Sequence, residues 1–181
     1  MTQWSGETHR RIAAAIRKAR GKRSAQWLAD RTAELNYPIT RAQIANYESG
    51  RKQSLDIVEL LVIAAALNTS PVALVYPGPY AKMVELLPGV EVPEMIAVEW
   101  FSANIDWRLE SAKLTDIERA NSELAEKNTR LLRRSREHFD ASMTMRTLIE
   151  ADDPSDSKLI EVYNQRIREL AKEIAEMESN A

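Results

Sequence analysis

Apolar residues recur at helical spacing through the first 76 residues, and polar segments separate the repeats. Apolar positions three or four residues apart predict amphipathic helices, because they share one face of a helix. Start and stop signals divide the pattern: Thr40 is a good N-cap, and Ser49-Gly50 suits a helix end. The pattern predicts a mainly α protein that begins with five short helices around one core, at about residues 7–19, 24–35, 40–48, 54–67 and 72–76.

The third of these helices has two different faces. Ile44 and Tyr47 lie three residues apart and are expected to point inward, as are Ile12 and Ile16 in the first helix and Leu28, Ala29, Thr32 and Leu35 in the second. This leaves Arg41, Ala42, Gln43 and Asn46 on or near the outward face. Arg can read guanine, and Asn or Gln can read adenine, in the major groove of DNA. The third helix is therefore interpreted as a recognition helix.

The segment from Thr40 to Arg51 resembles the Cro and lambda-repressor-like (XRE) helix-turn-helix family, together with Ser24 and Leu28-Ala29 before it and 55–67 after it. The resemblance covers roughly residues 8–76 and implies a five-helix DNA-binding domain, in which Ala29 lets two helices cross closely. Two departures affect the helix pair. Residues 34–38 lengthen the turn, where the usual glycine is replaced by Asn36, which also tolerates the left-handed conformation. Ala25 stands where relatives often have a polar DNA contact.

Charge is distributed unevenly along the chain. The net charge is −2, yet residues 1–52 hold 11 basic against 4 acidic residues, a balance of +7 that leaves −9 for the rest. Such asymmetry is typical of a basic nucleic-acid-binding face with an acidic remainder. Within it, the cluster from Arg17 to Arg23 would suit the C-terminus of the first helix as well as a phosphate. A solvated charged surface is the alternative for a charge run on its own, and it loses weight beside a recognition-helix pattern.

Residues 77–93 contain four of the seven prolines and two of the five glycines, and so predict a domain boundary. Within them, 82–87 and 90–92 are strand-like and predict a small hairpin. The apolar helical repeat 95–101 follows, and this connector resembles that of actinobacterial and actinophage XRE regulators. We expect a DNA-binding domain at 1–76, a connector at 77–104 and a helical, coiled-coil region at 105–181.

Heptads begin after residue 105. With Leu114 at position a, the a sites continue as Asn121, Asn128, Ser135 and Ser142, and the d sites are Ile117, Leu124, Leu131, His138 and Met145. A second apolar register holds Ile160, Tyr163, Ile167, Leu170, Ile174 and Met177. Asn at an a site favours dimers, which predicts a homodimer through Leu114, Ile117, Asn121, Leu124, Asn128 and Leu131. The alternative is an antiparallel hairpin within one chain, and a dimer of two hairpins satisfies both.

Signals for catalysis, cofactors and membranes are lacking in the sequence. The chain has no Cys, and its two histidines, His9 and His138, lie in different regions. The cluster Asp152, Asp153 and Asp156 lacks the glycine and closing glutamate of a calcium loop. No apolar run approaches the roughly 20 residues that span a bilayer, and the N-terminus lacks a signal peptide. We expect a cytoplasmic protein that is not an enzyme and has no cofactor or metal.

These patterns together predict a sequence-specific regulator that binds double-stranded DNA. Arg41, Gln43 and Asn46 would read base edges and Ala42 a thymine methyl, while phosphates would be held by Ser24, Gln26, Thr40, Arg51 and Lys52. The family resemblance implies a repressor of phage-immunity or prophage type that occludes a promoter. The alternatives are an antitoxin-like autoregulator whose C-terminal helices bind a protein partner, and a coiled-coil adaptor that does not bind DNA.

Overall fold

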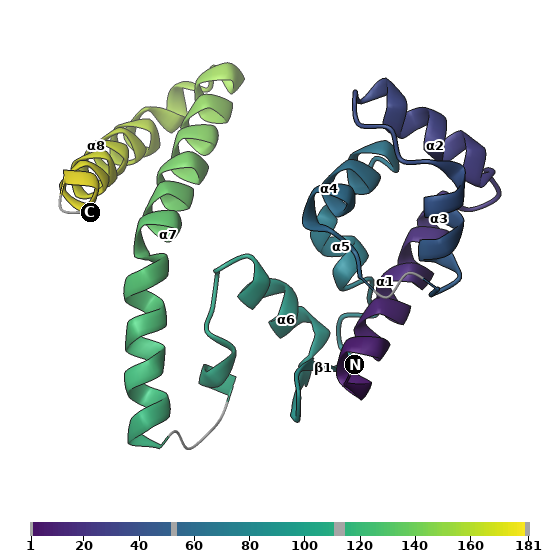
Figure 1. Ribbon diagram of the computed structural model, residues 1–181. Coiled ribbons are helices and arrows are strands. Elements are labelled where there is room, and N and C mark those ends of the chain that lie inside the picture. Colours follow the sequence, from purple (N-terminus) through teal and green to yellow (C-terminus); the bar gives the residue numbers. More distant parts are fainter. Residues whose placement is uncertain (1, 52–53, 111–114, 180–181) are drawn as a thin grey trace. The chain divides into compact units, whose positions relative to one another are not determined.

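A computed structural model describes residues 2–51, 54–110 and 115–179 and is mainly helical, as expected (Figure 1). The chain divides into two compact units, Met1–Phe101 and Ser102–Ala181, called here the N-terminal and C-terminal units. The N-terminal unit contains α1 (Gln3–Arg20), α2 (Ala25–Glu34), α3 (Arg41–Glu48), α4 (Ile57–Ala66) and α5 (Pro71–Val75), followed by β1 (Met83–Leu87), β2 (Val90–Pro93) and α6 (Glu94–Phe101).

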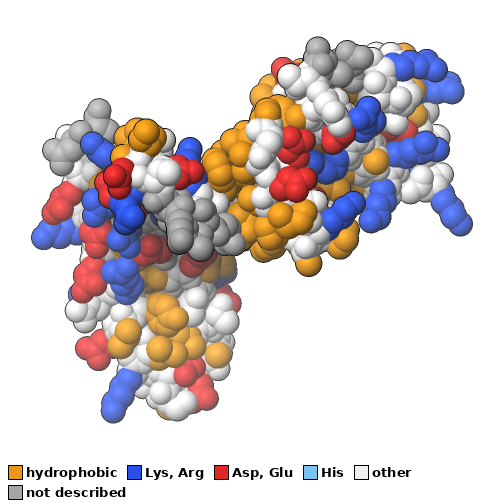
Figure 2. All heavy atoms as spheres, turned by 90° about the horizontal axis from the view of Figure 1, so that it is seen from below, with side chains coloured by type: hydrophobic (Ala, Val, Ile, Leu, Met, Phe, Trp, Pro, Cys, Tyr) orange, Lys and Arg blue, Asp and Glu red, His pale blue; other side chains and the backbone are white. Residues whose placement is uncertain are grey.

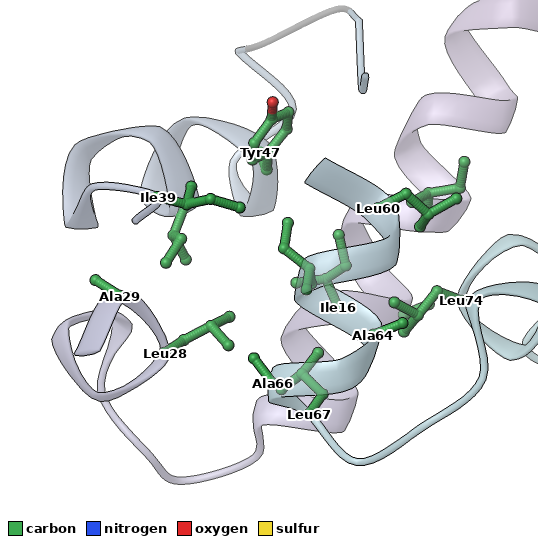
Figure 3. Close-up of a cluster of buried hydrophobic side chains, with 14 residues drawn as sticks. Ile16, Leu28, Ala29, Ile39, Tyr47, Leu60, Ala64, Ala66, Leu67 and Leu74 are labelled. Atoms are coloured by element: carbon green, nitrogen blue, oxygen red, sulfur yellow. The ribbon is translucent and has the colours of Figure 1, made fainter. Parts of the chain in front are cut away.

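The first five helices share one apolar core (Figure 3). Its fully buried side chains include Ile16 of α1, Leu28 of α2, Ile44 of α3, Ile63 of α4 and Leu74 of α5. The inward positions expected in the first three helices are confirmed with one exception. Leu35 is 43% exposed, because α2 ends at Glu34 and Leu35 follows its last turn.

Polar side chains set the starts of the helices. The Ser24 hydroxyl accepts a hydrogen bond from the Trp27 N–H at 3.0 Å and begins α2, as its sequence position predicts. The fourth helix was expected to open at Ser54 or Leu55, but it begins at Ile57. The reason is that Asp56 is its N-cap, with a carboxylate oxygen 2.7 Å from the Val58 N–H.

The turn between α2 and α3 is held by one buried threonine. The Thr32 hydroxyl donates to the Ala29 carbonyl at 2.8 Å and accepts from the Ile39 N–H at 3.0 Å. Asn36 has a φ of 60°, so it takes the left-handed conformation that usually favours glycine. Because Ile39 is only 1% exposed, the lengthened turn is fixed at its far end by core packing.

The expected connector packs with the helices. β1 and β2 form the predicted antiparallel hairpin, with Val84 opposite Val92. The Trp4 indole Nε1 of α1 donates to the Glu85 carbonyl of β1 at 3.1 Å, and the rings of Tyr76 and Phe101 meet edge to face with centres 6.1 Å apart. Residues 77–101 therefore belong to the N-terminal unit, and the division falls at 101/102, later than the boundary expected after residue 76.

The C-terminal unit is a long helical hairpin. The short helix η1 (Trp107–Glu110) precedes α7 (Asp116–Ala151), and η2 (Pro154–Asp156) leads into α8 (Ser157–Ser179). Arg166 pairs with Glu137 at 2.9 Å, whereas Glu173, later in α8, pairs with the earlier Arg134 at 3.2 Å. This order shows that α8 runs back antiparallel to α7, which is the intramolecular pairing that the sequence left open.

The seam between α7 and α8 matches the second predicted register. Leu170 is fully buried, and Ile160, Tyr163, Ile167, Ile174 and Met177 are half-buried. With about 1.5 Å of rise per residue, the 23 residues of α8 cover only part of the 36-residue α7. The remaining stripe on α7, called here the α7 stripe, is exposed within the chain: Ile117, Asn121, Leu124, Asn128 and Leu131. Leu114 lies outside the described residues.

Candidate nucleic-acid interface

Helix α3 presents a polar, open face on the N-terminal unit. Ile44 and Tyr47 are buried, at 0% and 4% exposure, so the opposite side of this two-turn helix faces outward. The exposed residues are Arg41, Ala42, Ala45 and Asn46. Three of these were expected. Ala45 was missed, although its position one residue after Ile44 places it toward the outward side.

Gln43 has a structural role that the sequence prediction did not assign to it. Its side-chain carbonyl oxygen accepts hydrogen bonds from the Thr40 N–H at 2.9 Å and from the Thr40 hydroxyl at 2.7 Å, while the Gln43 N–H donates back to that hydroxyl at 3.2 Å. This is a reciprocal capping box at the start of α3. A bidentate contact with adenine needs both ends of the amide, so in this conformation Gln43 does not offer one.

The other residues expected to contact DNA lie on the same unit, and their side chains are engaged within the protein to different extents. Ser24 and Thr40 are exposed N-caps whose hydroxyls are engaged by their own helices. The Gln26 amide nitrogen donates to the Asp30 carboxylate at 2.7 Å. Arg51 is exposed just after α3, and Lys52 lies outside the described residues.

An ion pair attaches the end of α3 to α1. Arg20, in the last turn of α1, makes two parallel contacts with Glu48, the last residue of α3, with Nε–Oε1 and Nη2–Oε2 distances of 2.6 Å each. The side chains are only 14% and 10% exposed. The hydrogen bond with Glu48 raises the pKa of Arg20 above its usual value. Such a bidentate pair fixes position and orientation together.

A second contact attaches α3 to α4. The buried Tyr47 hydroxyl donates to the buried Glu59 carboxylate. Together with Arg20–Glu48, it holds the C-terminal half of α3 from two neighbouring helices. Neither pair was expected from the sequence, since Arg20 is separated from Glu48 by 28 positions and Tyr47 from Glu59 by 12. The sequence offered one signal: Tyr47, on the inward face of α3, and the adjacent Glu48 both need hydrogen-bonding partners once they are buried.

The basic cluster of residues 17–23, in the last turn of α1 and the loop after it, divides into two kinds of residue. Arg23 donates to the Ala19 carbonyl at 2.7 Å, and its guanidinium carbon lies 4.0 Å from the centre of the Trp27 ring. Arg23 therefore satisfies a carbonyl near the end of α1, the role that the sequence left open beside phosphate binding, whereas Arg20 is held by Glu48. Arg17, Lys18 and Lys22 are exposed. Figure 2 shows Lys and Arg side chains gathered toward the right-hand edge of the N-terminal unit.

Residues 2–51, 54–110 and 115–179 contain no group of three or more His, Asp or Glu side chains placed to hold a metal ion. Across the same ranges, each helix is too short or too polar to cross a membrane. Comparisons with protein-family models, with curated proteins and with solved structures find no match for this chain.

Proposed function

We propose that this protein is a sequence-specific regulator that binds double-stranded DNA, with α2 and α3 acting as a helix-turn-helix. The observation that supports this most is the outward face of α3, formed by Arg41, Ala42, Ala45 and Asn46, on a helix whose inner face and C-terminal end are fixed. A short helix with small residues between Arg and Asn can approach base edges closely. Gln43 contributes by holding the start of this helix.

Charge supports the same proposal. The balance of +7 over residues 1–52 gives the surroundings of α3 the sign that a phosphate backbone attracts. Arg51 is exposed directly after α3, and Ser24 begins α2. In this proposal, these residues and Lys52 set the register on the backbone, while Arg41 and Asn46 distinguish bases.

In this proposal, the C-terminal unit joins two copies of the chain, as an operator with two half-sites requires. The α7 stripe carries apolar d sites 37–75% exposed and Asn at both a sites, a composition suited to pairing with the same stripe of another chain. When two N-terminal units are linked, binding of the first to DNA raises the effective concentration of the second at the neighbouring half-site. Repression by promoter occlusion, implied by the family resemblance, follows if the operator overlaps a promoter.

The test begins with selection of bound duplexes from a random pool, followed by titration of the selected site and a scrambled site. Arg41→Ala should cost about 1 to 3 kcal/mol on the selected site and relax preference at one base position. Arg51→Ala should weaken binding to both sites and make the slope of log affinity against log salt shallower by about one unit. Arg168→Ala, at an exposed position of α8, is the matched control and should leave both properties unchanged.

Equal losses on selected and scrambled DNA would assign Arg41 to the backbone and remove its reading role. The absence of salt-dependent binding to any duplex would overturn the proposal and favour the adaptor alternative. Recovery of a protein partner that requires α7 and α8, with DNA binding intact, would instead favour the autoregulator.

A further inference from the structure

The N-terminal unit contains a cavity away from the outward face of α3. It lies between α1, the β1–β2 hairpin and the segment after α5, and its volume is about 350 Å³. A water molecule occupies roughly 30 Å³ in the liquid, and small-molecule sites begin at about 300 Å³. The cavity therefore has room for a small organic molecule. Its walls include Trp4, Glu7, Arg11, Lys82, Glu91 and Glu94.

One wall of the cavity carries a buried carboxylate. Glu94 is 4% exposed and begins α6, where its backbone N–H donates to the Lys82 carbonyl at 2.8 Å. Among the residues that the structure describes, none donates a hydrogen bond to its carboxylate. Buried carboxylates are normally paired or hydrogen-bonded, because losing water is costly for a charged group. An uncommitted carboxylate at a cavity wall points to a cationic group as occupant.

The guanidinium of Arg11 forms part of the wall of the same cavity. Arg11 is half-buried, its Nε donates to the Val75 carbonyl at 2.9 Å, and its guanidinium carbon lies 5.2 Å from the centre of the Tyr76 ring. These contacts fix the group and leave its two terminal nitrogens without a hydrogen-bond acceptor in the described residues. Arg11 and Glu94 attract each other electrostatically, but within this part of the chain they form no ion pair. The cavity thus offers a held guanidinium and a buried carboxylate that do not pair with each other among the described residues.

The remaining walls add an aromatic surface and negative charge. The Trp4 indole Nε1 donates to the Glu85 carbonyl at 3.1 Å, which holds the ring against the hairpin beside the cavity. Glu7 and Glu91 are exposed at the cavity, opposed there by Lys82. Aromatic faces and carboxylates both favour cations. A ligand with more cationic than anionic groups fits this charge balance.

We propose that this cavity binds a small zwitterion with an additional cationic group, such as a basic amino acid. Its carboxylate would pair with Arg11, and a cationic group would pair with Glu94. The second cationic group would lie near Trp4 and the exposed carboxylates. A simple cation would leave Arg11 without a partner and a simple anion would leave Glu94 without one, so a molecule with both charges satisfies the two groups together. The proposal does not depend on DNA binding.

Isothermal titration of the full chain with three related probes tests the proposal. L-arginine carries all the required groups, agmatine lacks the carboxylate, and L-citrulline lacks the side-chain cation. L-arginine should bind at least tenfold more tightly than either. Glu94→Gln and Arg11→Gln should each weaken L-arginine binding at least tenfold, and Glu161→Gln, exposed on α8, should not. Arg11→Gln should also remove the preference for L-arginine over agmatine.

Several outcomes would overturn the proposal. They are undetectable heat and no shift in melting temperature with millimolar L-arginine, equal affinity for all three probes, or affinity unchanged by both cavity substitutions. Circular dichroism of each variant without ligand checks the fold. If Arg11→Gln unfolds the protein, Lys82→Ala provides the second arm. It should strengthen L-arginine binding by removing an exposed positive charge, and weaker binding with the fold intact would count against the charge argument.

Discussion

The two units of this chain are both helical, but they bury their side chains differently. In the N-terminal unit, α1 to α5 enclose a shared core that includes fully buried Ile16, Leu28 and Leu74 (Figure 3). In the described part of the C-terminal unit, the buried apolar residues are Ala141 and Leu170. Short helices around a closed core can bury one another's apolar faces. Two long helices of unequal length leave part of the longer one uncovered. The first unit thus encloses its own core, whereas the described part of the second leaves the α7 stripe exposed.

Removing the C-terminal unit is the most drastic way to test this comparison. A fragment ending at Phe101 should keep its helices and a cooperative melting transition, because its core is internal. If the α7 stripe links two copies, affinity for an operator with two half-sites should fall about 100-fold or more, by loss of effective concentration. Circular dichroism and DNA titration measure the two effects. A fragment that binds as tightly as the full chain would show that the second unit contributes nothing to DNA binding.

Breaking the contact between α1 and α3 should have the next largest effect. Glu48→Gln leaves the Arg20 guanidinium mostly buried without its charged partner, and unfolding free energy should fall by about 2 kcal/mol. Because Glu48 ends α3, discrimination between operator and scrambled DNA should fall as well. Glu34→Gln is the matched control, since Glu34 forms an exposed ion pair with Arg31. Its effect on stability should stay within about 0.5 kcal/mol, and an equal loss in both variants would remove the special role of Arg20–Glu48.

Asn121 and Asn128 test whether the α7 stripe meets a second copy. In a parallel pair, replacing both with Leu removes buried amides and should raise the melting temperature while loosening the choice between dimers and larger assemblies. Sedimentation equilibrium of the wild type and the double variant measures the assembly directly. Asn164→Leu, at an exposed position of α8, is the control. A monomeric wild type, or an unchanged mass in the double variant, would show that the stripe does not pair in this way.

The sequence predicted those features that depend on neighbouring residues. The caps at Ser24 and Thr40, the left-handed Asn36, the small hairpin and the apolar register of α8 each depend on a few adjacent positions. It also predicted which residues of α3 point inward and which point outward, because helical spacing fixes these positions. These local rules explain why the position of the candidate interface could be predicted while its supports could not.

The features that were missed depend on tertiary contacts. Arg20 belonged to a basic run in which any member suited phosphate, and only the packing of α1 against α3 assigns it to Glu48. Gln43 satisfied both the capping and the base-reading patterns, and the hydrogen bonds at Thr40 distinguish them. The proline-rich segment after residue 76 looked like a linker, yet Trp4 attaches the hairpin to α1. Composition alone does not reveal such contacts.

The smallest predicted effect concerns the start of α7, where local polar contacts replace core packing. Hydrogen bonds from the Thr115 backbone and hydroxyl to the Glu118 carboxylate lower the pKa of Glu118 below its usual value. A carboxylate with a lowered pKa stabilises the folded state above its unfolded pKa, and this contribution is lost as the pH falls through the folded pKa. The stability that the Glu118 carboxylate contributes to the folded state should therefore begin to fall below about pH 4.3.

Carboxyl-detected NMR titration should give a midpoint for Glu118 below that usual value. Thr115→Val removes the hydroxyl but keeps the backbone donor, so the midpoint should return only part of the way. Glu118→Gln preserves an acceptor for the capping box, and it should keep the start of α7 ordered while removing this pH dependence. A midpoint in the wild type at the usual value, or one that Thr115→Val leaves unchanged, would show that the box does not hold the carboxylate in solution. The order of the first turn of α7 would then have to come from its association with other residues.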